Sequence, residues 1–215
     1  MKNKKSNYQI QLEKAQLEFP KWKHEEIARK YELTLDATYL YIKFFKSFYR
    51  IHRVTGQIER ESVTSEKSFV SAGFNEVMSI LDLLSYAKAE RRLTGQWSSV
   101  NHLSGMAHAG QAVGSDLFAP YAAKFDGRIP RLCAACQTLG GEKAPYADVS
   151  YILEVFEGFP VMLQFWNSDD EFSAQLKLLW DTAALDYVHF ETTFYIAFYL
   201  LGVLEKLMGD CDETT

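Results

Sequence analysis

The sequence has little of what builds disulfide scaffolds and membrane spans. It contains three cysteines among 215 residues, too few for a disulfide framework in a chain of this length. Its longest apolar stretch, Ile196 to Leu204, is far shorter than the ~20 residues that cross a bilayer. The basic first residues are not followed by a continuous apolar segment, so no secretory signal is expected. We therefore expect a soluble cytoplasmic protein without a membrane partner.

A basic surface is also missing. Lysine and arginine total 23 against 28 aspartate and glutamate residues, which gives a net charge of −5 and a pI near 5.6. Nucleic-acid-binding domains usually have the opposite balance, with basic side chains grouped on one face. No nucleic-acid partner is therefore expected. Apolar residues make up 47% of the chain, which is enough for a sizeable core.

The spacing of apolar residues predicts an α+β fold in which helices cover a mixed or antiparallel sheet. Residues 1–33 are predicted to be helical, and residues 38–61 to form two or three antiparallel strands. A second hairpin is predicted over residues 149–167, and a long C-terminal helix over residues 183–208. We expect one sheet built from both strand groups. A single domain is expected over residues 1–215, because no linker or repeat divides the chain.

The middle of the chain is predicted to be mostly helical. Ser71 is expected to cap an amphipathic helix that ends near Leu84, and two short helices are expected near 117–125 and 130–139. The segment from His102 to Ser115 is rich in glycine and lacks periodicity. Because binding residues are often carried on such loops, we expect it to form the mobile lip of a ligand pocket.

Several segments together are similar to an uncharacterised bacterial family. The matching residues are Thr94-Gly95-Gln96-Trp97, Leu139-Gly140-Gly141, Asp148, Phe165-Trp166, Asp169 to Phe172, Asp181 and Glu191. From about Ile27 to Leu207, the chain resembles the family called domain of unknown function three-seven-eight-six. Members are frequent in anaerobes, and some neighbour corrinoid and methyl-transfer proteins. The resemblance implies a bacterial cytoplasmic protein linked to anaerobic cofactor metabolism. An iron–sulfur role does not carry over, because this chain has no cysteine-rich segment.

Cys133 and Cys136 have the C-x-x-C spacing of a redox or metal pair. They share one helical stripe with Ile129, Leu132 and Leu139, which predicts that both thiols lie on an apolar face. A zinc site would need two further ligands at compatible spacing, and no second pair exists. We predict that both cysteines are small buried hydrophobic residues and that they hold no metal.

Two other clusters have an ordinary structural explanation. His102 and His108 flank part of the glycine-rich loop, but they lack the H-E-x-x-H spacing of a helical zinc site. Asp169 to Glu171 are consecutive acids without the alternating pattern and central glycine of a calcium-binding loop. We expect structural or exposed histidines, and a turn or helix cap at the acids.

His189 and Glu191 lie near the start of the last predicted helix. Two residues apart on a helix, they point about 200° away from one another, so one of them is expected to face the core or a cavity. A buried polar group needs a partner. Two alternatives follow, a hydrogen bond that anchors a neighbouring loop, and an acid–base or ligand contact.

Trp97, Trp166 and Trp180 each follow or end a strand-like stretch. Such aromatic residues usually fill a core, but they also offer faces on which a flat ligand can stack. We hypothesise a ligand site where the Trp97 segment, the strand ending at Trp166 and the start of the last helix converge. Its expected residues are Trp97, His102, Trp166, His189 and Glu191. A corrinoid, haem or flavin would suit it.

Three classes of function remain. A module that binds a small molecule or cofactor is favoured, and a partner-binding or assembly protein is the alternative. An enzyme of unknown reaction is the third class, because no nucleophile–base pair or set of metal ligands is recognisable in the sequence.

Overall fold

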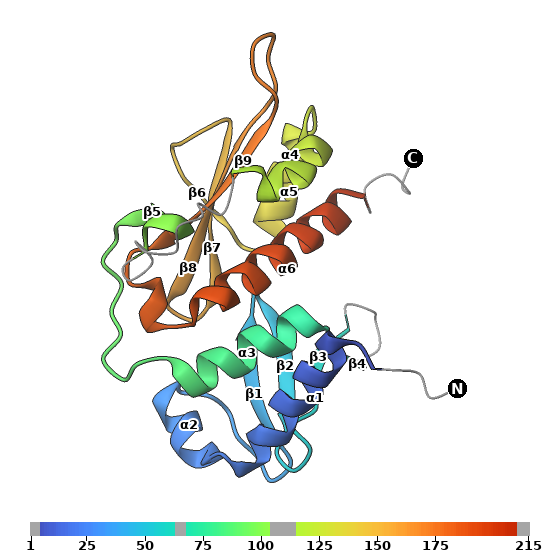
Figure 1. The fold of residues 1–215 in the computed structure, drawn as a ribbon, viewed down its shortest axis with the longest axis vertical. Helices are drawn as coiled ribbons and strands as arrows, with labels where there is room; N and C mark the ends of the chain where they lie inside the picture. The colour runs from blue at the N-terminus through green and yellow to red at the C-terminus, as the bar shows by residue number, and fades with distance from the viewer. Residues whose placement is uncertain (1–4, 63–67, 104–114, 210–215) are drawn as a thin grey trace.

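Two antiparallel sheets organise the computed structural model, which describes residues 5–62, 68–103 and 115–209 (Figure 1). The first sheet has the strand order β1-β2-β3-β4 and the second the order β5-β9-β8-β7-β6. The strands are β1 (Tyr39–Phe44), β2 (Ser47–His52), β3 (Ile58–Glu61), β4 (Phe69–Ser71), β5 (Trp97–Ser99), β6 (Glu142–Lys143), β7 (Val149–Phe156), β8 (Phe159–Trp166) and β9 (Gln175–Asp181). The predicted α+β class is confirmed.

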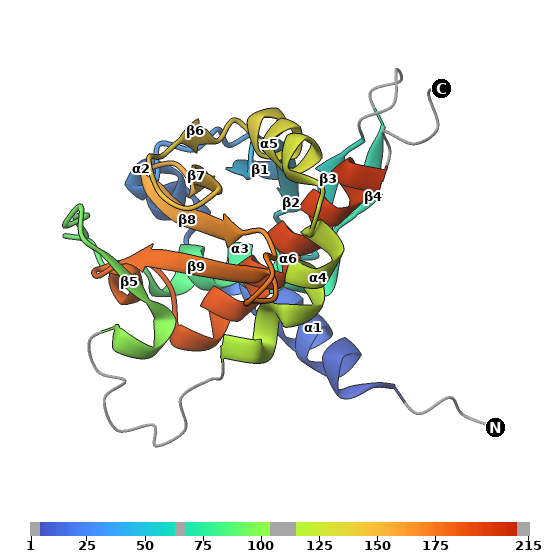
Figure 2. The ribbon, with the colours of Figure 1, turned by 90° about the horizontal axis from the view of Figure 1, so that it is seen from above.

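The helices fall into two groups, one beside each sheet (Figure 1). They are α1 (Asn7–Glu18), α2 (His24–Lys30), α3 (Phe74–Tyr86), α4 (Ala119–Phe125), α5 (Ile129–Thr138) and α6 (Phe190–Gly209). Short 3₁₀ turns are η1 (Phe19–Lys21), η2 (Val100–His102), η3 (Ser115–Phe118) and η4 (Ala184–Asp186). Helices α1, α2 and α3 accompany the first sheet, and α4 and α5 pack on β9 and β7 of the second (Figure 2). Helix α6 packs against α3, α4 and α5, so it links the two groups.

The expectation of one sheet built from both strand groups is wrong. The two hairpins meet through the β1–β2 turn instead of pairing along an edge: the Phe45 N–H donates to the Val155 carbonyl at 3.0 Å. Phe45 and Lys46 both have positive φ, 44° and 63°, as a two-residue type I′ turn requires. A bulky residue stays in this conformation only when its surroundings hold it there, and the Phe45 side chain is buried. Apolar side chains of both halves belong to one buried cluster.

The predicted elements are largely present, with shifts at their ends. Strands β1 to β3 cover the first predicted group, and β7 and β8 form the second hairpin. Strand β8, which is apolar on both faces, lies in the middle of its sheet, as such a sequence favours. The edge strands β5 and β6 are too short to show the alternation of apolar and polar residues from which a strand can be predicted.

Two predicted helix starts are wrong. Ser71 ends β4 and does not cap α3, because the Glu76 carboxylate reaches back to the Gly73 N–H and caps the helix there. The last helix begins at Phe190 and not at residue 183, because η4 occupies part of the intervening segment. The predicted loop between His102 and Ser115 lies mostly outside the described residues.

Candidate functional site

A cavity of about 420 Å³ lies where the first sheet faces the β7–β8 turn, and we call it the inter-sheet cavity. Its walls come from the end of α2, from β1 and β2, from α3 and the segment after it, and from the residue that follows η4. The residues that line it include Lys30, Tyr31, Lys43, Phe48, Arg91 and Tyr187. The volume falls within the range of small-molecule sites.

A stack of rings holds one guanidinium group in this cavity. Trp180 stacks on Phe159 at 5.9 Å between ring centroids, and Phe159 stacks on Tyr187 at 4.7 Å. The Arg91 guanidinium carbon lies 5.6 Å from the Tyr187 centroid and 4.7 Å from that of Tyr31. Cation–π contacts with two rings orient the planar guanidinium. Its Nη1 donates to the Lys88 carbonyl at 3.1 Å. The remaining N–H groups can donate to a carboxylate or phosphate of a ligand.

A second cation, Lys30, contacts the same tyrosine ring, Tyr31. The Lys30 Nζ donates to the Ala87 carbonyl and lies 4.9 Å from the Tyr31 ring centroid. The Tyr31 hydroxyl donates to the Leu83 carbonyl at 2.6 Å, which fixes the ring. Burial raises the pKa of Tyr31 to about 12, so this phenol is neutral at pH 7. The two cations therefore face a rigid, uncharged aromatic wall.

The charge of the cavity is opposite in sign to that of the whole chain. Its lining includes the cations Lys30, Lys43 and Arg91 and the acids Glu32 and Glu157, whereas the chain has a net charge of −5. Among the described residues, none of these three cations forms an ion pair with a carboxylate. A cavity that groups unpaired cations in an acidic protein favours an anionic ligand.

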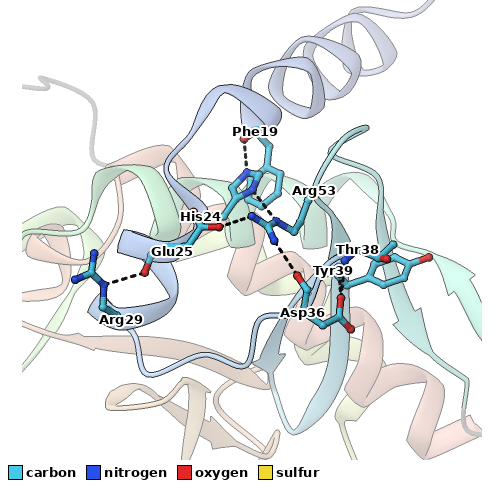
Figure 3. A network of polar contacts seen from close by, with 8 residues as sticks. All are labelled: Phe19, His24, Glu25, Arg29, Asp36, Thr38, Tyr39 and Arg53. Carbon is cyan, nitrogen blue, oxygen red and sulfur yellow. Dashed lines mark hydrogen bonds and ion pairs between the residues drawn. The ribbon is translucent and has the colours of Figure 1, made fainter.

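A polar network around the buried His24 fixes the start of helix α2, which carries Lys30 at its other end, to the first sheet (Figure 3). The buried His24 ring stacks on Phe19, and its Nε2 lies 2.9 Å from the Phe19 carbonyl. Arg53 donates through Nε to the Nδ1 of His24, through Nη1 to the Asp36 carbonyl, and pairs with Glu25. Since Nδ1 accepts a hydrogen bond, the neutral ring carries its hydrogen on Nε2. This network fixes the start of α2, and the hydrogen bonds of Lys30 and Tyr31 fix its end.

The structure does not bring Trp97 and Trp166 together. Trp97 pairs with Asp181 at one end of β9, and Trp166 pairs with Gln175 at the other. Six residues along a strand correspond to about 20 Å. Trp97 and Trp166 are half-buried, whereas Trp180 is buried in the core. The expected convergence of these elements on one planar ligand is therefore not observed.

His102 lies in η2, where its Nδ1 is 2.8 Å from the hydroxyl of Ser99. His108 and the loop that follows His102 and Leu103 lie outside the described residues. Within the described parts of the chain, no three histidine, cysteine, aspartate or glutamate side chains are grouped so that they could hold a metal ion. A ligand role for His102 stays a prediction.

His189 and Glu191 are both exposed, so the expectation that one of them faces the core is wrong. His189 precedes α6, so the angular argument for two helical residues does not apply to it. Its backbone N–H and its Nδ1 both contact the Asp82 carboxylate, at 2.8 and 2.6 Å. The ring also lies against Tyr86. The observed arrangement matches the anchoring alternative, in this case between α3 and α6, and a ligand role stays a prediction.

Cys133 and Cys136 lie on α5, and Cys136 is buried in the apolar cluster as predicted. Cys133 is only half-buried and packs against the edge of the cluster, so the prediction that both thiols are buried is wrong for Cys133. Burial, and then the neighbouring Cys133, raise the pKa of Cys136 to about 12. The thiol therefore stays protonated at pH 7, whereas metal ligation and nucleophilic attack require a thiolate.

We expect the double variant Cys133→Ala, Cys136→Ala to keep its fold and any ligand-binding activity of the protein. Loss of a small buried sulfur atom leaves a small cavity, which costs about 1 kcal/mol. Circular dichroism, urea unfolding and elemental analysis of the purified protein check this expectation. A stoichiometric metal present in the native chain and missing from the double variant would contradict it.

The acidic cluster forms a turn, as predicted. Asp169 Oδ1 accepts hydrogen bonds from the N–H groups of Glu171 and Phe172, at 2.9 and 2.7 Å. These bonds lower the pKa of Asp169. The carboxylate is thus used to close the turn between β8 and β9.

The family model described as a domain of unknown function, DUF3786, matches residues 23–201. The chain belongs to the DUF3786 family. Searches of curated proteins and of solved structures return no significant match.

Two of the segments that match the DUF3786 family, Thr94 to Trp97 and Asp181, meet at a buried carboxylate. Asp181, which is 1% exposed, accepts hydrogen bonds from the N–H and hydroxyl of Thr94 and from the N–H groups of Gly95 and Ala183. These bonds outweigh the effect of burial, so the pKa of Asp181 is lowered. The DUF3786 segment Thr94 to Trp97 is therefore anchored to the end of β9, beside the residues that lead to Tyr187.

The sequence did not predict that the cations of the inter-sheet cavity lie together, because they belong to no common motif. Lys30 ends α2, and Arg91 lies between α3 and β5, about sixty positions later. The Arg91-Arg92 pair after an amphipathic helix was the one available local signal. Basic pairs of this kind are common at exposed helix ends, so the pair alone does not indicate a site. Among the described residues, no helix is long and apolar enough to cross a membrane.

Proposed function

We propose that this DUF3786 protein binds a small anionic molecule in the inter-sheet cavity, with the anionic group between Lys30 and Arg91. The observation that carries the proposal is the pair of cations held against one tyrosine ring. The Lys30 Nζ and the Arg91 guanidinium carbon lie 4.9 and 4.7 Å from the Tyr31 centroid. Neither has a carboxylate partner among the described residues. An anion of the ligand would relieve the repulsion between them.

The rest of the lining favours a ligand with a flat apolar part. Phe48, Phe156, Tyr41 and Tyr187 contribute rings or ring edges to the same cavity. A planar ligand gains from such surfaces by stacking and by apolar burial. The flavin phosphate and the haem carboxylates combine a flat ring with an anion, and a corrinoid is the third candidate that the resemblance to anaerobe proteins suggests. A cytoplasmic role in anaerobic cofactor metabolism is part of this proposal.

Titration with flavin mononucleotide, haem and cobalamin tests the proposal, with tryptophan emission and calorimetry as readouts. Trp180 is the expected reporter, because it is joined to the cavity wall by the stack through Phe159 and Tyr187. A charge-assisted hydrogen bond contributes about 1.5–3 kcal/mol, and about 1.4 kcal/mol corresponds to tenfold in affinity. We therefore expect Arg91→Ala to raise the Kd at least about tenfold.

Arg92→Ala is the matched control, because Arg92 is the exposed neighbour of the same type and does not line the cavity. Its Kd should equal that of the native chain. Arg91→Lys keeps the charge but removes the planar fork, so it should bind more weakly than the native chain. Equal affinity in the native and Arg91→Ala proteins would place the ligand elsewhere. Absence of binding below about 1 mM for all three probes would favour the alternative function.

The alternative is a partner-binding protein, and helix α1 favours it. This helix has no buried residue, and it exposes Tyr8 and Leu17, each to 66%, together with Ile10. Exposed apolar residues on one element are typical of interaction surfaces. A stable hetero-complex that Tyr8→Ala with Leu17→Ala disrupts, observed by native mass spectrometry, would support this alternative.

A further inference from the structure

Lys30 differs from an ordinary surface lysine in what its amine contacts. Its Nζ donates to a neutral acceptor, the Ala87 carbonyl, and no carboxylate pairs with it among the described residues. Arg91 lies against the same tyrosine ring, so the two charged groups are no more than about 10 Å apart, the sum of their distances to its centroid. Lys30 is exposed at the mouth of the cavity, and the charge of Arg91 nearby disfavours the ammonium form, whereas the hydrogen bond to Ala87 favours it.

Two physical causes act in the same direction on this group. Desolvation, and then the charge of Arg91, lower the pKa of Lys30. Only the unprotonated amine is a nucleophile. Desolvation and a neighbouring cation are the two means by which proteins activate a lysine for reaction with a carbonyl group.

We propose that Lys30 forms a reversible imine with a ligand that carries an aldehyde or keto group, while Arg91 holds the carboxylate or phosphate of that ligand. This inference rests on the proposed function, since it assigns a class of ligand to the same cavity. The ligand class is a carbonyl compound with an anionic group and, on the evidence of the ring-lined wall, a flat body.

The proposed step needs no oxidant or reductant. The nitrogen lone pair of the neutral amine attacks the carbonyl carbon, and the electrons of the C=O π bond move to the oxygen, which takes up a proton. That proton is balanced by the loss of one proton from the nitrogen, which gives the neutral carbinolamine. The carbinolamine then loses its hydroxyl group and the remaining amine hydrogen as water, and a C=N bond forms. A proton from solvent then makes the iminium, which has the same charge as the ammonium that it replaces. Hydrolysis reverses the sequence and releases the ligand.

Lys43 provides an internal comparison. It also lines the cavity, but its Nζ lies 5.1 Å from the ring of Phe48, which is itself half exposed. Arg91 shares no ring with it. A reaction governed by exposure alone would label both lysines. A reaction governed by the neighbouring guanidinium and by the geometry of the cavity would favour Lys30.

Pyridoxal phosphate is a suitable probe, because it combines an aldehyde, a planar ring and a phosphate. The protein is incubated with the probe at pH 8, the imine is reduced with borohydride, and the labelled lysines are identified by peptide mass spectrometry. We expect Lys30 to carry at least about tenfold more label than Lys43, and Arg91→Ala to lower this labelling about tenfold. Pyruvate has a carboxylate in place of the phosphate, so labelling with pyruvate tests whether the anionic group of the ligand is a carboxylate.

Pyridoxine phosphate, which has an alcohol in place of the aldehyde, separates the two proposals. Binding of this analogue to the native chain and to Lys30→Arg, with labelling of Lys30 by the aldehyde, supports both. Binding of the analogue without preferential labelling of Lys30 overturns the imine and leaves anion binding in place. Uniform labelling of lysines that Arg91→Ala does not change overturns the imine as well. Absence of analogue binding argues against this class of ligand in the cavity.

Discussion

Gly56→Ala is expected to destabilise the protein by about 3 kcal/mol or more, through a steric overlap that no side-chain movement relieves. Gly56 lies in the β2–β3 turn with φ of +70°, and a Cβ atom there would lie 1.9 Å from the backbone carbonyl oxygen of Gln16 in α1. Relief of the overlap requires the turn or the helix to move. Urea unfolding followed by circular dichroism measures the loss as a lower midpoint at unchanged slope.

Gly127→Ala separates the overlap from the cost of the backbone conformation. Gly127 has nearly the same φ, +69°, but a Cβ atom there would meet no heavy atom within 4 Å. The left-handed conformation costs an alanine about 1–2 kcal/mol, partly offset by a less flexible unfolded chain. Gly56→Ala should therefore lose clearly more stability than Gly127→Ala. Equal losses would show that the contact between the turn and α1 is not as close as described.

Asp181→Ala is expected to destabilise the protein by about 1–3 kcal/mol, because it removes a buried carboxylate that is the shared acceptor of several hydrogen bonds. The backbone N–H groups of Thr94, Gly95 and Ala183 and the Thr94 hydroxyl all donate to this carboxylate. The carboxylate itself is 1% exposed, although Thr94 and Gly95 lie at the surface. The comparison is Asp169→Ala, where an exposed carboxylate accepts two similar hydrogen bonds in a turn. Its loss should be much smaller, because water replaces the lost acceptor.

The effect of Asp181 should also depend on pH. Its pKa is lowered in the folded state, so its stabilisation is present above the unfolded value of about 3.9 and is lost as the pH falls through the folded value. The difference in unfolding free energy between the native chain and Asp181→Asn should therefore be constant near neutral pH. It should shrink below about pH 4. A difference that stays the same between pH 7 and pH 3 would argue against a charged Asp181.

The regular elements followed from local patterns in the chain. The apolar stripes of α3 and α6 and the mostly apolar sequence of β8 are local features, and each is present as predicted. Their ends were less accurate, because caps are made by single contacts. Glu76 closes the start of α3 from inside the helix, and η4 delays the start of α6. Such contacts compete within a few tenths of a kcal/mol with the alternatives next to them.

The ligand hypothesis relied on residues whose position could not be known before the strands were paired. Trp97 and Trp166 were grouped because both are aromatic and lie next to strands, yet the register of β9 places them at opposite ends. His189 was assigned to a helix that begins one residue later. Sequence periodicity describes the faces of an element, whereas strand register depends on the partner strand.

The sequence alone determined that this is an α+β chain of the DUF3786 family, that it has an acidic composition, and that Cys136 lies on an apolar helix face. Each of these properties depends on composition or on neighbours within a few turns. Only the tertiary structure decided that the strands divide into two sheets, and that Lys30, Arg91 and Tyr187 meet at one cavity. These three residues are separated by about sixty and about one hundred positions. Contacts over such separations require the closure of long loops, which costs entropy, and they depend on the whole fold. No local sequence pattern therefore predicts them.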